Sequence, residues 1–476
     1  HGEWALPVFP KAMGMVGSPI TPYIWDSRCD FREARDRICQ LYNMTSEERK
    51  RIGEEGRKWA TSDEAGFTAE KMGQNFIKHT DKLFSTWTPR KNFTFWKDTE
   101  DHSEWKFMLD YIIPNLTAKP DIWCQITVPN EFQPVGNYNI GLTAGIETTA
   151  CAPQWIEGCN RMDLILTSSE HSKKVFEHTK YQQKNNQTGQ ETLMEVTTPI
   201  EVLFEGANLD VYKGIKEFNN KELFDHIQNI PEKFAYLFVG HWLQGSLGHD
   251  RKNVGLLIKA FYEVYKNKSN APALILKTCI GKGSHIDRRE VMKRIHSIRK
   301  SIPSKNLPNV YLVHGDFSDS DINELYNHPK VKAMISATKG EGFGRPLLEF
   351  ALTGKPVIAT AWSGQIDFLN PKLSPLMGGK LAKLDPSSMQ KDMLIEGSEW
   401  FEVDHGHLGF FLKDVKKNYK KWSKQGKTLS SRLKKNFSYD AMKSKLIDIL
   451  DKNVSVPSQT ILKLPEVKGV KLPTLK

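Results

Sequence analysis

The sequence predicts an α/β protein in which a helical N-terminal segment precedes two series of buried parallel strands. Three observations support this fold class. Residues 30–83 place apolar residues three and four positions apart among charged ones, as amphipathic helices do. From about residue 121 the chain changes to short apolar runs that each end in a polar or glycine turn, a pattern typical of buried strands in an α/β layer. A second series of such runs starts near residue 232, and the length of 476 residues suits two or three domains.

The first expected element is a helical segment over residues 1–97. Thr45 and Ser46 stand directly before Glu47 and Glu48, which suits a helix start because hydroxyl and carboxylate oxygens satisfy the free N–H groups there. No strand-like run is apparent ahead of the first strand series. We therefore expect helices and no strands in this segment.

The two strand series predict two domains, over residues 98–215 and 216–452. The first series is DIWCQITVP, NIGLTAG, MDLILTSS and IEVLFEG, and the second is KFAYLFVG, APALILK, NVYLVHG, VKAMISAT and KPVIAT. Amphipathic stretches such as NVGLLIKAFYEVYKNK lie between strands of the second series, so this domain is expected to be doubly wound. The join falls near the polar residues 206–232. Residues 453–476 carry prolines and lysines without a helical period and are expected to be extended or disordered.

One internal repeat is apparent. Residues 38–82 can be aligned with residues 412–452, and both segments close on Asp-Lys. The matched positions include Phe67 with Phe437 and Met72 with Met442. Both segments resemble the last helices of one kind of domain, so residues 1–97 are hypothesised to come from a tandem or rearranged protein of which this chain is a fragment. Chance similarity between two basic helix pairs is the alternative.

Charge and cysteine content suggest the partners and the compartment. Lys and Arg number 67 against 56 Asp and Glu, a formal charge of +11, which favours polyanionic partners; a lysine-rich surface without such a partner is the alternative. The six cysteines form no CxxC pair, so we expect reduced thiols in a cytosol-like compartment, with a Cys151–Cys159 disulfide as the alternative. No apolar run approaches the roughly 20 residues of a membrane span, and no signal peptide is apparent. A soluble, cytoplasmic protein is expected.

The segment VKAMISATKGEGFGRPLLEFALTG predicts a strand, a glycine loop and a helix. Pro346 suits the first helical turn, where a missing N–H is harmless. The free N–H groups of such a helix start bind phosphate oxygens, and Gly342 and Gly344 allow close approach. Glu341 precedes the helix and Glu349 lies about one turn inside it, so both carboxylates can flank one bound molecule and accept hydrogen bonds from its hydroxyls. The pattern predicts a nucleotide-sugar site; a helix cap plus a surface glutamate is the alternative for the two carboxylates.

These residues carry a family resemblance. Glu341 through Glu349, followed by ALTGKPVIATAWSGQIDFL, resembles the E-x7-E signature of retaining GT-B glycosyltransferases of the family-four type. FVGHWLQGSLGHDRKNVGLLIKAF resembles the first strand and helix of that family's donor domain, and KGEGFGRPLLE and WSGQIDFL are similar to glycosyltransferase-like proteins of large bacteriophages. The resemblance covers roughly residues 120–452. It implies a GT-B fold, in which two Rossmann-like domains face a cleft, residues 98–215 being a reduced acceptor domain and residues 216–452 the donor domain.

The resemblance also implies roles for particular residues. Glu349 would hold the donor ribose, and Glu341 would contact hydroxyls of the transferred sugar. Arg251 and Lys252 would neutralise the leaving diphosphate in place of a metal ion; a solvated surface pair is the alternative. The remaining expected donor-binding residues are Asp316, near the base, and Gly342, Phe343, Gly344 and Arg345 of the glycine loop.

The chain departs from the family pattern in two places. Where relatives often place a histidine, it has Glu147, which would be a catalytic polar group beside the transferred sugar or, alternatively, a helix cap. The family's opening strand and glycine loop are not visible in residues 1–120. The N-terminal sheet is therefore expected to be smaller than usual, unless another segment replaces the missing part.

The resemblance implies a hexosyltransferase-type enzyme that retains the anomeric configuration. A UDP-sugar is the expected donor substrate, no cofactor or metal is expected, and modified phage DNA or a glycan is the expected acceptor, with the host cytoplasm as the location if the protein is viral. A GT-B-fold sugar-nucleotide epimerase is one alternative. A non-catalytic nucleic-acid-binding protein is another, suggested by the charge and by an aromatic and basic stretch that could stack bases. That stretch contains Trp87, Arg90, Lys91, Phe93, Phe95 and Trp96.

Overall fold

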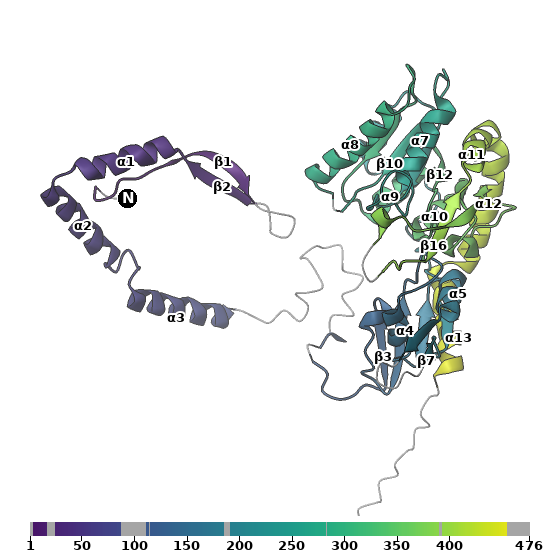
Figure 1. Cartoon of the computed structure of the whole chain (residues 1–476), viewed down its shortest axis with the longest axis horizontal. Coiled ribbons are helices and arrows are strands. Elements are labelled where there is room, and N and C mark those ends of the chain that lie inside the picture. Colours follow the sequence, from purple (N-terminus) through teal and green to yellow (C-terminus); the bar gives the residue numbers. More distant parts are fainter. Residues whose placement is uncertain are drawn as a thin grey trace, which may run out of the picture. The chain divides into compact units, whose positions relative to one another are not determined.

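The structure is a computed structural model that describes residues 3–16, 24–86, 111–113, 115–184, 191–281, 283–389 and 393–454. The chain forms two compact units, His1–Leu116 and Thr117–Lys476 (Figure 1). The aromatic and basic stretch from Trp87 to Trp96 and the tail after Val454 lie outside the described residues. The predictions made for these two segments remain predictions.

The described residues of the first unit form a hairpin and three helices. The hairpin is formed by β1 (Pro10–Val16) and β2 (Ile24–Cys29), and the helices are α1 (Phe31–Asn43), α2 (Ser46–Ala60) and α3 (Ala69–Thr86). The predicted helix start is confirmed: the Glu48 N–H donates to the Thr45 hydroxyl at 3.2 Å, and the Thr45 N–H donates to the Glu48 carboxylate at 2.9 Å. This reciprocal pair satisfies two N–H groups that the helix itself leaves free.

The expectation that no strand precedes residue 121 is wrong. β1 and β2 pair antiparallel, with Pro10 opposite Cys29 and Val16 opposite Ile24. Residues 10–12 and 27–29 of this hairpin are exposed. An exposed hairpin is held by pairing between its backbones and needs no continuous apolar run, so a search for buried strands does not detect it.

The second unit begins with a four-stranded parallel sheet in the order β3-β4-β5-β8. Its strands are β3 (Ile122–Ile126), β4 (Tyr138–Thr143), β5 (Leu164–Thr167) and β8 (Ile200–Val202), which are the four predicted apolar runs. This half also contains η2 (Pro129–Glu131), α4 (Pro153–Cys159), α5 (Glu170–His178) and an antiparallel hairpin of β6 (Tyr181–Lys184) and β7 (Glu191–Met194). We call residues 117–206 the acceptor half, after the role that the sequence predicts for it.

A six-stranded parallel sheet, in the order β11-β10-β9-β12-β13-β14, forms the other half. Its strands are β9 (Ala235–Val239), β10 (Ala273–Lys277), β11 (Val310–Val313), β12 (Val331–Ile335), β13 (Val357–Thr360) and β14 (Leu376–Met377). Helix α6 (Lys221–Gln228) precedes these strands, and the helices between them are α7 (Val254–Tyr265), α8 (His285–Lys300), α9 (Asp319–Asn327) and α10 (Arg345–Ala351). The strand order reverses at β9, so the sheet is doubly wound, as predicted. We call residues 207–436 the donor half.

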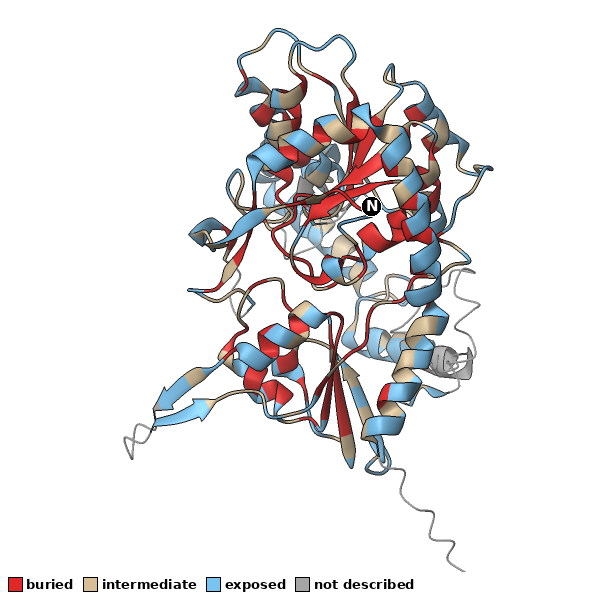
Figure 2. Cartoon of the chain, turned by 90° about the vertical axis from the view of Figure 1, so that its right-hand side faces the viewer, coloured by how far each residue is buried: buried red, intermediate tan, exposed pale blue. Residues whose placement is uncertain are grey.

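Alternate residues of the central strands face opposite sides of the donor sheet. Leu237 and Ile275 lie in one buried apolar cluster, whereas Phe238 and Leu276 lie in the cluster on the other face. Figure 2 shows these strands buried between layers of helices. Burial on both faces explains why the strands read as continuous apolar runs in the sequence.

The described part of the chain ends with a hairpin and three helices. After η3 (Gly364–Asp367), β15 (Gly379–Lys383) and β16 (Glu399–Val403) pair antiparallel, with η4 (Pro386–Ser388) in their connection. Helices α11 (His405–Lys417), α12 (Tyr419–Asn436) and α13 (Tyr439–Asn453) follow. The sequence assigned α13 to the donor domain. Ala441 and Met442, near its start, pack against the core of the donor half. Ile449 packs with Ile140 and Leu164 of the acceptor half, and the Tyr138 hydroxyl donates to the Asn453 carbonyl at 3.0 Å.

The two repeated segments share local structure but differ in packing. Each lies in a run of three consecutive helices, and the last helix of each run has an equivalent hydroxyl at its start. The Lys71 N–H donates to the Thr68 hydroxyl, and the Ala441 N–H donates to the Ser438 hydroxyl, both at 3.2 Å. Helices α1 and α2 are described in full and bury no residue, whereas α11 and α12 bury several.

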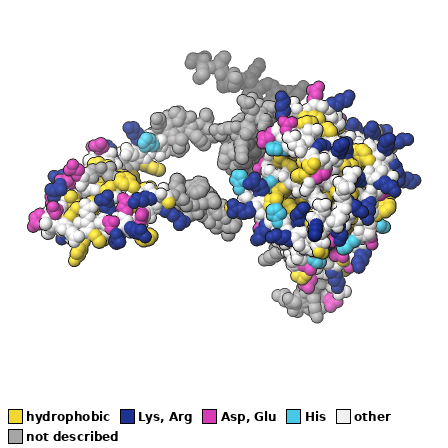
Figure 3. Space-filling model, turned by 90° about the horizontal axis from the view of Figure 1, so that it is seen from above, with side chains coloured by type: hydrophobic (Ala, Val, Ile, Leu, Met, Phe, Trp, Pro, Cys, Tyr) yellow, Lys and Arg dark blue, Asp and Glu magenta, His cyan; other side chains and the backbone are white. Residues whose placement is uncertain are grey.

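The charged surface and the cysteines can be compared with what the sequence predicts for them. On the face shown in Figure 3, lysine and arginine side chains are scattered among acidic and apolar ones. All six cysteines lie in described residues and are free thiols, in agreement with the expected reduced state. No helix in the described part of the chain is long and apolar enough to cross a membrane.

Candidate functional site

The glycine loop lies where the sequence predicts it, between β12 and α10. Gly344 is the residue before α10 and has a φ of 99°, a conformation that glycine adopts without strain. Pro346 lies in the first turn of the helix, as predicted. The N–H of Glu341 donates to the Ser363 hydroxyl at 2.9 Å, but the N–H groups of residues 342–344 donate to no described residue. Three backbone donors are therefore available to an anion.

Two glycines of the loop also let the acceptor half come close. A methyl group at Gly340 would collide with the carbonyl oxygen of Glu147, and one at Gly342 would collide with that of Ala144. The sequence attributed the close approach at Gly342 to phosphate. In the structure the backbone of the acceptor half occupies that side of the loop, so these glycines also set the contact between the halves.

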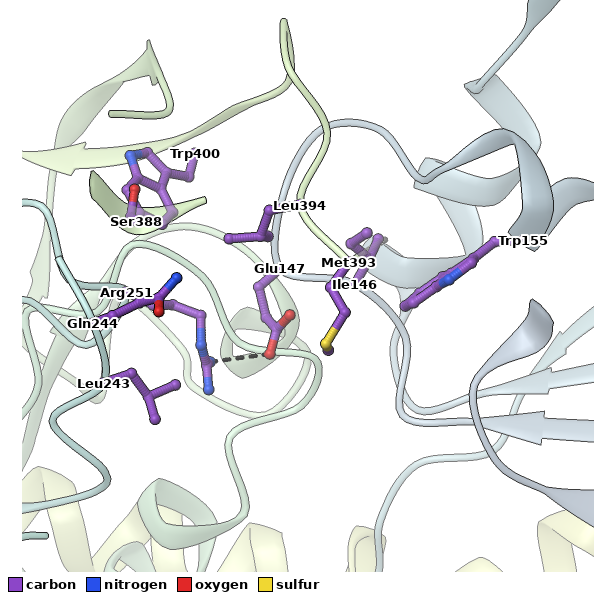
Figure 4. Close-up of a pocket in the computed structure, with 10 residues that line it drawn as sticks. All are labelled: Ile146, Glu147, Trp155, Leu243, Gln244, Arg251, Ser388, Met393, Leu394 and Trp400. Atoms are coloured by element: carbon purple, nitrogen blue, oxygen red, sulfur yellow. Dashed lines mark ion pairs between the residues drawn. The ribbon is translucent and has the colours of Figure 1, made fainter. Parts of the chain in front are cut away.

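Four charged residues form an ion network beside the loop, in which Glu341 is buried and the other three are partly buried. The ammonium of Lys252 lies 2.6 Å from both carboxylate oxygens of Glu341. The guanidinium of Arg251 lies 3.5 Å from Glu341 and 3.1 Å from Glu147 (Figure 4), and it donates to the Gly340 carbonyl at 3.0 Å. The network joins the expected catalytic residues, Glu341 and Glu147, to the two expected diphosphate ligands, although Glu147 comes from the other half of the unit.

The cations of this network keep Glu341 ionised. Burial raises the pKa of its carboxyl group, but the charges of Lys252 and Arg251 outweigh burial, so the net pKa lies below its usual value. For Lys252 burial is the larger effect and lowers the pKa of the ammonium group, although the charge of Glu341 opposes this shift. The opposite charges still favour the ionised form of Glu341. Glu341 is therefore a hydrogen-bond acceptor, suited to hydroxyl groups.

Glu349 lies in a different environment. Its carboxylate is buried, lies 2.8 Å from the guanidinium of Arg345, and accepts a hydrogen bond from the Tyr326 hydroxyl at 3.5 Å. Burial raises the pKa of Glu349 to about 7, although the charge of Arg345 opposes the shift. Because Arg345 is 61% exposed, a ligand can reach the outer side of this pair.

Phe343 and Asp316, two of the expected donor-binding residues, differ in burial. The Phe343 side chain is buried in the core and packs against Phe368, with ring centroids 5.1 Å apart, so only its backbone can face a ligand. Asp316 is exposed just beyond β11. The neighbouring Lys277 donates to the Gly315 carbonyl at 2.7 Å, and its ammonium lies 4.8 Å from the Phe317 ring centre.

Sequence reasoning missed Glu205, which follows β8 where the chain passes between the halves. Burial raises the pKa of its carboxyl group, the charge of Arg345 opposes the shift and the charge of Glu341 adds to it. Glu205 thus belongs to the electrostatic surroundings of Glu341 and Arg345. The signal for Glu205 in the sequence was an acidic residue at the end of the apolar run IEVLF.

Sequence reasoning also missed a cavity between the halves. Ile146, Glu147 and Trp155 line it from the acceptor half. Leu243, Gln244 and Arg251 line it from the loop after β9 (Figure 4). The connection between β15 and β16 completes the wall, and its contributions include Met393, Leu394 and, from β16, Trp400. Nothing in the sequence pattern indicated that this insertion reaches the site.

The halves also meet away from the ion network. The Thr149 N–H donates to the Glu399 carbonyl, and the Glu399 N–H donates to the Thr149 hydroxyl, each at 2.9 Å. The Glu170 N–H donates to the Asp367 carboxylate at 2.9 Å. Within the described residues no group of three or more His, Cys, Asp or Glu side chains is arranged to hold a metal ion.

The chain is similar to known sugar-transferring proteins. Residues 221–373, which include the glycine loop, match the family described as glycosyl transferases group 1. This match supports the expectation that the chain is a glycosyltransferase. No curated protein sequence matches the chain.

The solved structures that are similar to the chain include the following three. HepE of Anabaena with UDP and glucose has 14% identity and a TM-score of 0.45 over 66% of this chain and 72% of that one. Sucrose-phosphate synthase of Thermosynechococcus elongatus has 12% identity and a TM-score of 0.47 over 70% and 73%. A UDP-forming α,α-trehalose-phosphate synthase of Burkholderia xenovorans, with glucose-6-phosphate, has 10% identity and a TM-score of 0.47 over 76% and 80%.

Proposed function

We propose that the chain transfers a sugar from a nucleotide diphosphate to an acceptor hydroxyl and retains the configuration at the anomeric carbon. The ion network of Glu147, Arg251, Lys252 and Glu341 carries this proposal. It brings two cations and two hydrogen-bond acceptors to a loop with three free backbone N–H groups. A sugar diphosphate needs this combination, because its phosphates are anionic and its sugar presents hydroxyls.

Donor binding is proposed to rearrange the network. The diphosphate would take hydrogen bonds from the loop and share the charges of Arg251 and Lys252. Glu341, now less tightly paired, would accept hydrogen bonds from the sugar. The ribose hydroxyls would donate to Glu349, whose carboxylate lies behind Arg345. The exposed Asp316 and the partly buried Phe317 mark the end of the site proposed for the base.

The transfer is proposed to occur on one face of the sugar. The acceptor oxygen forms a bond to the anomeric carbon while the bond from that carbon to the phosphate oxygen breaks, and the acceptor proton passes to the leaving phosphate. Arg251 and Lys252 stabilise the charge that develops on the phosphate. Each network glutamate is paired with a cation, which makes both poor nucleophiles and supports this route over a covalent sugar intermediate.

A UDP-sugar is the proposed donor, and the proposed acceptors are a modified DNA base or a glycan. The formal charge of +11 favours DNA over a glycan as the acceptor, because DNA is a polyanion. Similarity to phage enzymes, like the family-four assignment, rests on the residues of the E-x7-E segment.

Incubation with UDP-sugars, together with hydroxymethylated DNA or glycan acceptors, tests the proposal. We expect UDP release and an acceptor whose mass rises by one sugar, with the α linkage of the donor kept. Both should fall in Glu341→Gln and persist in Glu263→Gln, which removes an exposed carboxylate that pairs with Lys266 on α7. A changed free nucleotide sugar without any acceptor product would instead support an epimerase.

A further inference from the structure

The cavity between the halves differs from the ion network in its chemistry. One end is polar, where Glu147 and Arg251 form their ion pair at 3.1 Å. Gln244 and Ser388 add two polar groups to the lining, and the remaining lining residues, such as Trp155, Leu243 and Leu394, are apolar (Figure 4). A ligand in this cavity would thus meet charged groups at one end and hydrocarbon along its length.

The size of the cavity suits a single ring. Its volume is about 110 Å³, somewhat less than the roughly 150 Å³ of an engineered apolar cavity that binds benzene. The cavity opens toward the solvent, so a larger molecule could place only one ring inside it. A chain of several sugars would not fit in this volume.

Two walls of the cavity are fixed and one is adaptable. Trp155 is buried and stacks on Phe176, with ring centroids 6.2 Å apart. Trp400 is fully buried, and the ammonium of Lys339 lies 5.1 Å from its ring centre. Met393 is 44% exposed, and a flexible thioether adjusts to the shape of a ring and makes favourable contacts with aromatic groups.

We propose that this cavity binds the acceptor, and that the acceptor hydroxyl is carried by an aromatic ring or by a carbon attached to one. The assignment rests on the proposed function. The ring would lie among Trp155, Met393 and Leu394, and its hydroxyl would lie at the Glu147–Arg251 end, next to the residues that hold the sugar donor. A free hexose is a poor occupant, because its hydroxyls would lose water without gaining partners along the apolar walls.

Ligand binding without any donor tests the chemistry of the cavity. Benzyl alcohol serves as the aromatic probe and myo-inositol as the polyhydroxyl one, each titrated into the full chain and followed by ligand-observed saturation-transfer NMR. We expect benzyl alcohol to bind at least tenfold more tightly than myo-inositol. Equal binding of the two probes, or tighter binding of myo-inositol, would overturn the proposal.

A matched pair of variants locates the bound probe. Leu394→Asn changes a leucine that lines the cavity, and Leu381→Asn changes an exposed leucine on β15 of the same hairpin, outside the cavity. We expect Leu394→Asn to weaken benzyl alcohol binding at least fivefold and Leu381→Asn to leave it unchanged. Circular dichroism confirms that both variants are folded. Equal affinities in both variants would show that the probe binds elsewhere and would overturn the assignment.

A transfer assay separates failure of this inference from failure of the proposed function. Benzyl alcohol and each UDP-sugar are incubated with the chain, and UDP release and benzyl glycoside are measured. Glycoside formation that is reduced in Leu394→Asn and normal in Leu381→Asn supports the inference. UDP release with transfer to a sugar acceptor, but never to benzyl alcohol, would overturn the acceptor class while the proposed function stands. No UDP release from any donor would contradict the proposed function itself.

Discussion

The ammonium of Lys252 lies 2.6 Å from both carboxylate oxygens of Glu341. Both side chains are buried, with 12% and 8% of their surface exposed. A charge pair with so little water around it is stable only while both partners remain, or while a ligand replaces one of them. A change to this pair is therefore expected to affect donor binding, stability and catalysis.

Glu341→Gln is expected to lower kcat by about 10- to 100-fold, the effect of losing one charge-assisted hydrogen bond. UDP affinity should change by no more than about threefold, because Lys252 loses a competing partner and remains free for phosphate. Steady-state kinetics and calorimetric titration with UDP measure the two effects separately. Unchanged turnover would remove Glu341 from the proposed catalytic role.

Lys252→Met is expected to lower the free energy of unfolding by about 3 kcal/mol, because Glu341 becomes a buried charge with only the more distant Arg251 nearby. The double variant Lys252→Met/Glu341→Met should be more stable than Lys252→Met. Urea denaturation measures both. Lys266→Met, which breaks an exposed pair with Glu263, is the control and should cost less than about 0.5 kcal/mol. A double variant less stable than either single one would contradict this view of the pair.

Donor binding should depend on pH through Glu349. Burial raises the pKa of its carboxyl group to about 7, and only the ionised form accepts hydrogen bonds at both oxygens. We expect KM for the donor to fall as pH rises from about 6 to 8, and this dependence to be absent in Glu349→Gln. A wild-type KM that stays constant across this range would contradict the ribose assignment.

The raised pKa of Glu349 also makes the stability of the folded chain depend on pH. The pKa of Glu349 in the folded chain lies above the ordinary value of 4.5, so the unfolded chain loses this proton more readily. Relative to Glu349→Gln, the wild-type chain should therefore lose stability as pH rises from about 4.5 to 7. Urea denaturation of both proteins at several pH values in this range measures the difference. A wild type that gains stability relative to the variant over this range would show that the shift has the opposite sign.

Gly340→Ala tests the contact between the halves, because the added methyl group would collide with the carbonyl oxygen of Glu147. We expect at least a tenfold loss of kcat/KM for transfer, with donor binding reduced much less. Gly214→Ala is the control, since nothing lies within 4 Å of its added methyl group. Equal kcat/KM values for the two variants would show that the halves need not meet at this point during transfer.

Much of the fold could be predicted because each buried strand is one short apolar segment, which can be recognised without knowing what packs against it. The central strands β5, β9 and β10 are apolar runs because nearly all of their residues are buried. The glycine loop was predictable for a similar reason: Pro346 and the spacing of Glu341 and Glu349 belong to one strand–loop–helix segment. The hairpin of β1 and β2 has no such pattern and was missed.

The assembly of the site could not be predicted in the same way. Glu147 and Arg251 are about a hundred positions apart and belong to different halves, so their ion pair depends on how the two sheets meet. The inward position of Phe343 depends on the packing around Phe368 and Phe437. Trp155 and Trp400 had no pattern that marked them as neighbours of one cavity.

A crystal structure of the chain with UDP tests the central claim most directly. We predict that the diphosphate lies against the N–H groups of residues 342–344, with Arg251 and Lys252 as its cationic partners and the ribose at Glu349. A diphosphate bound elsewhere, with the ion pair between Lys252 and Glu341 intact, would contradict the proposed function.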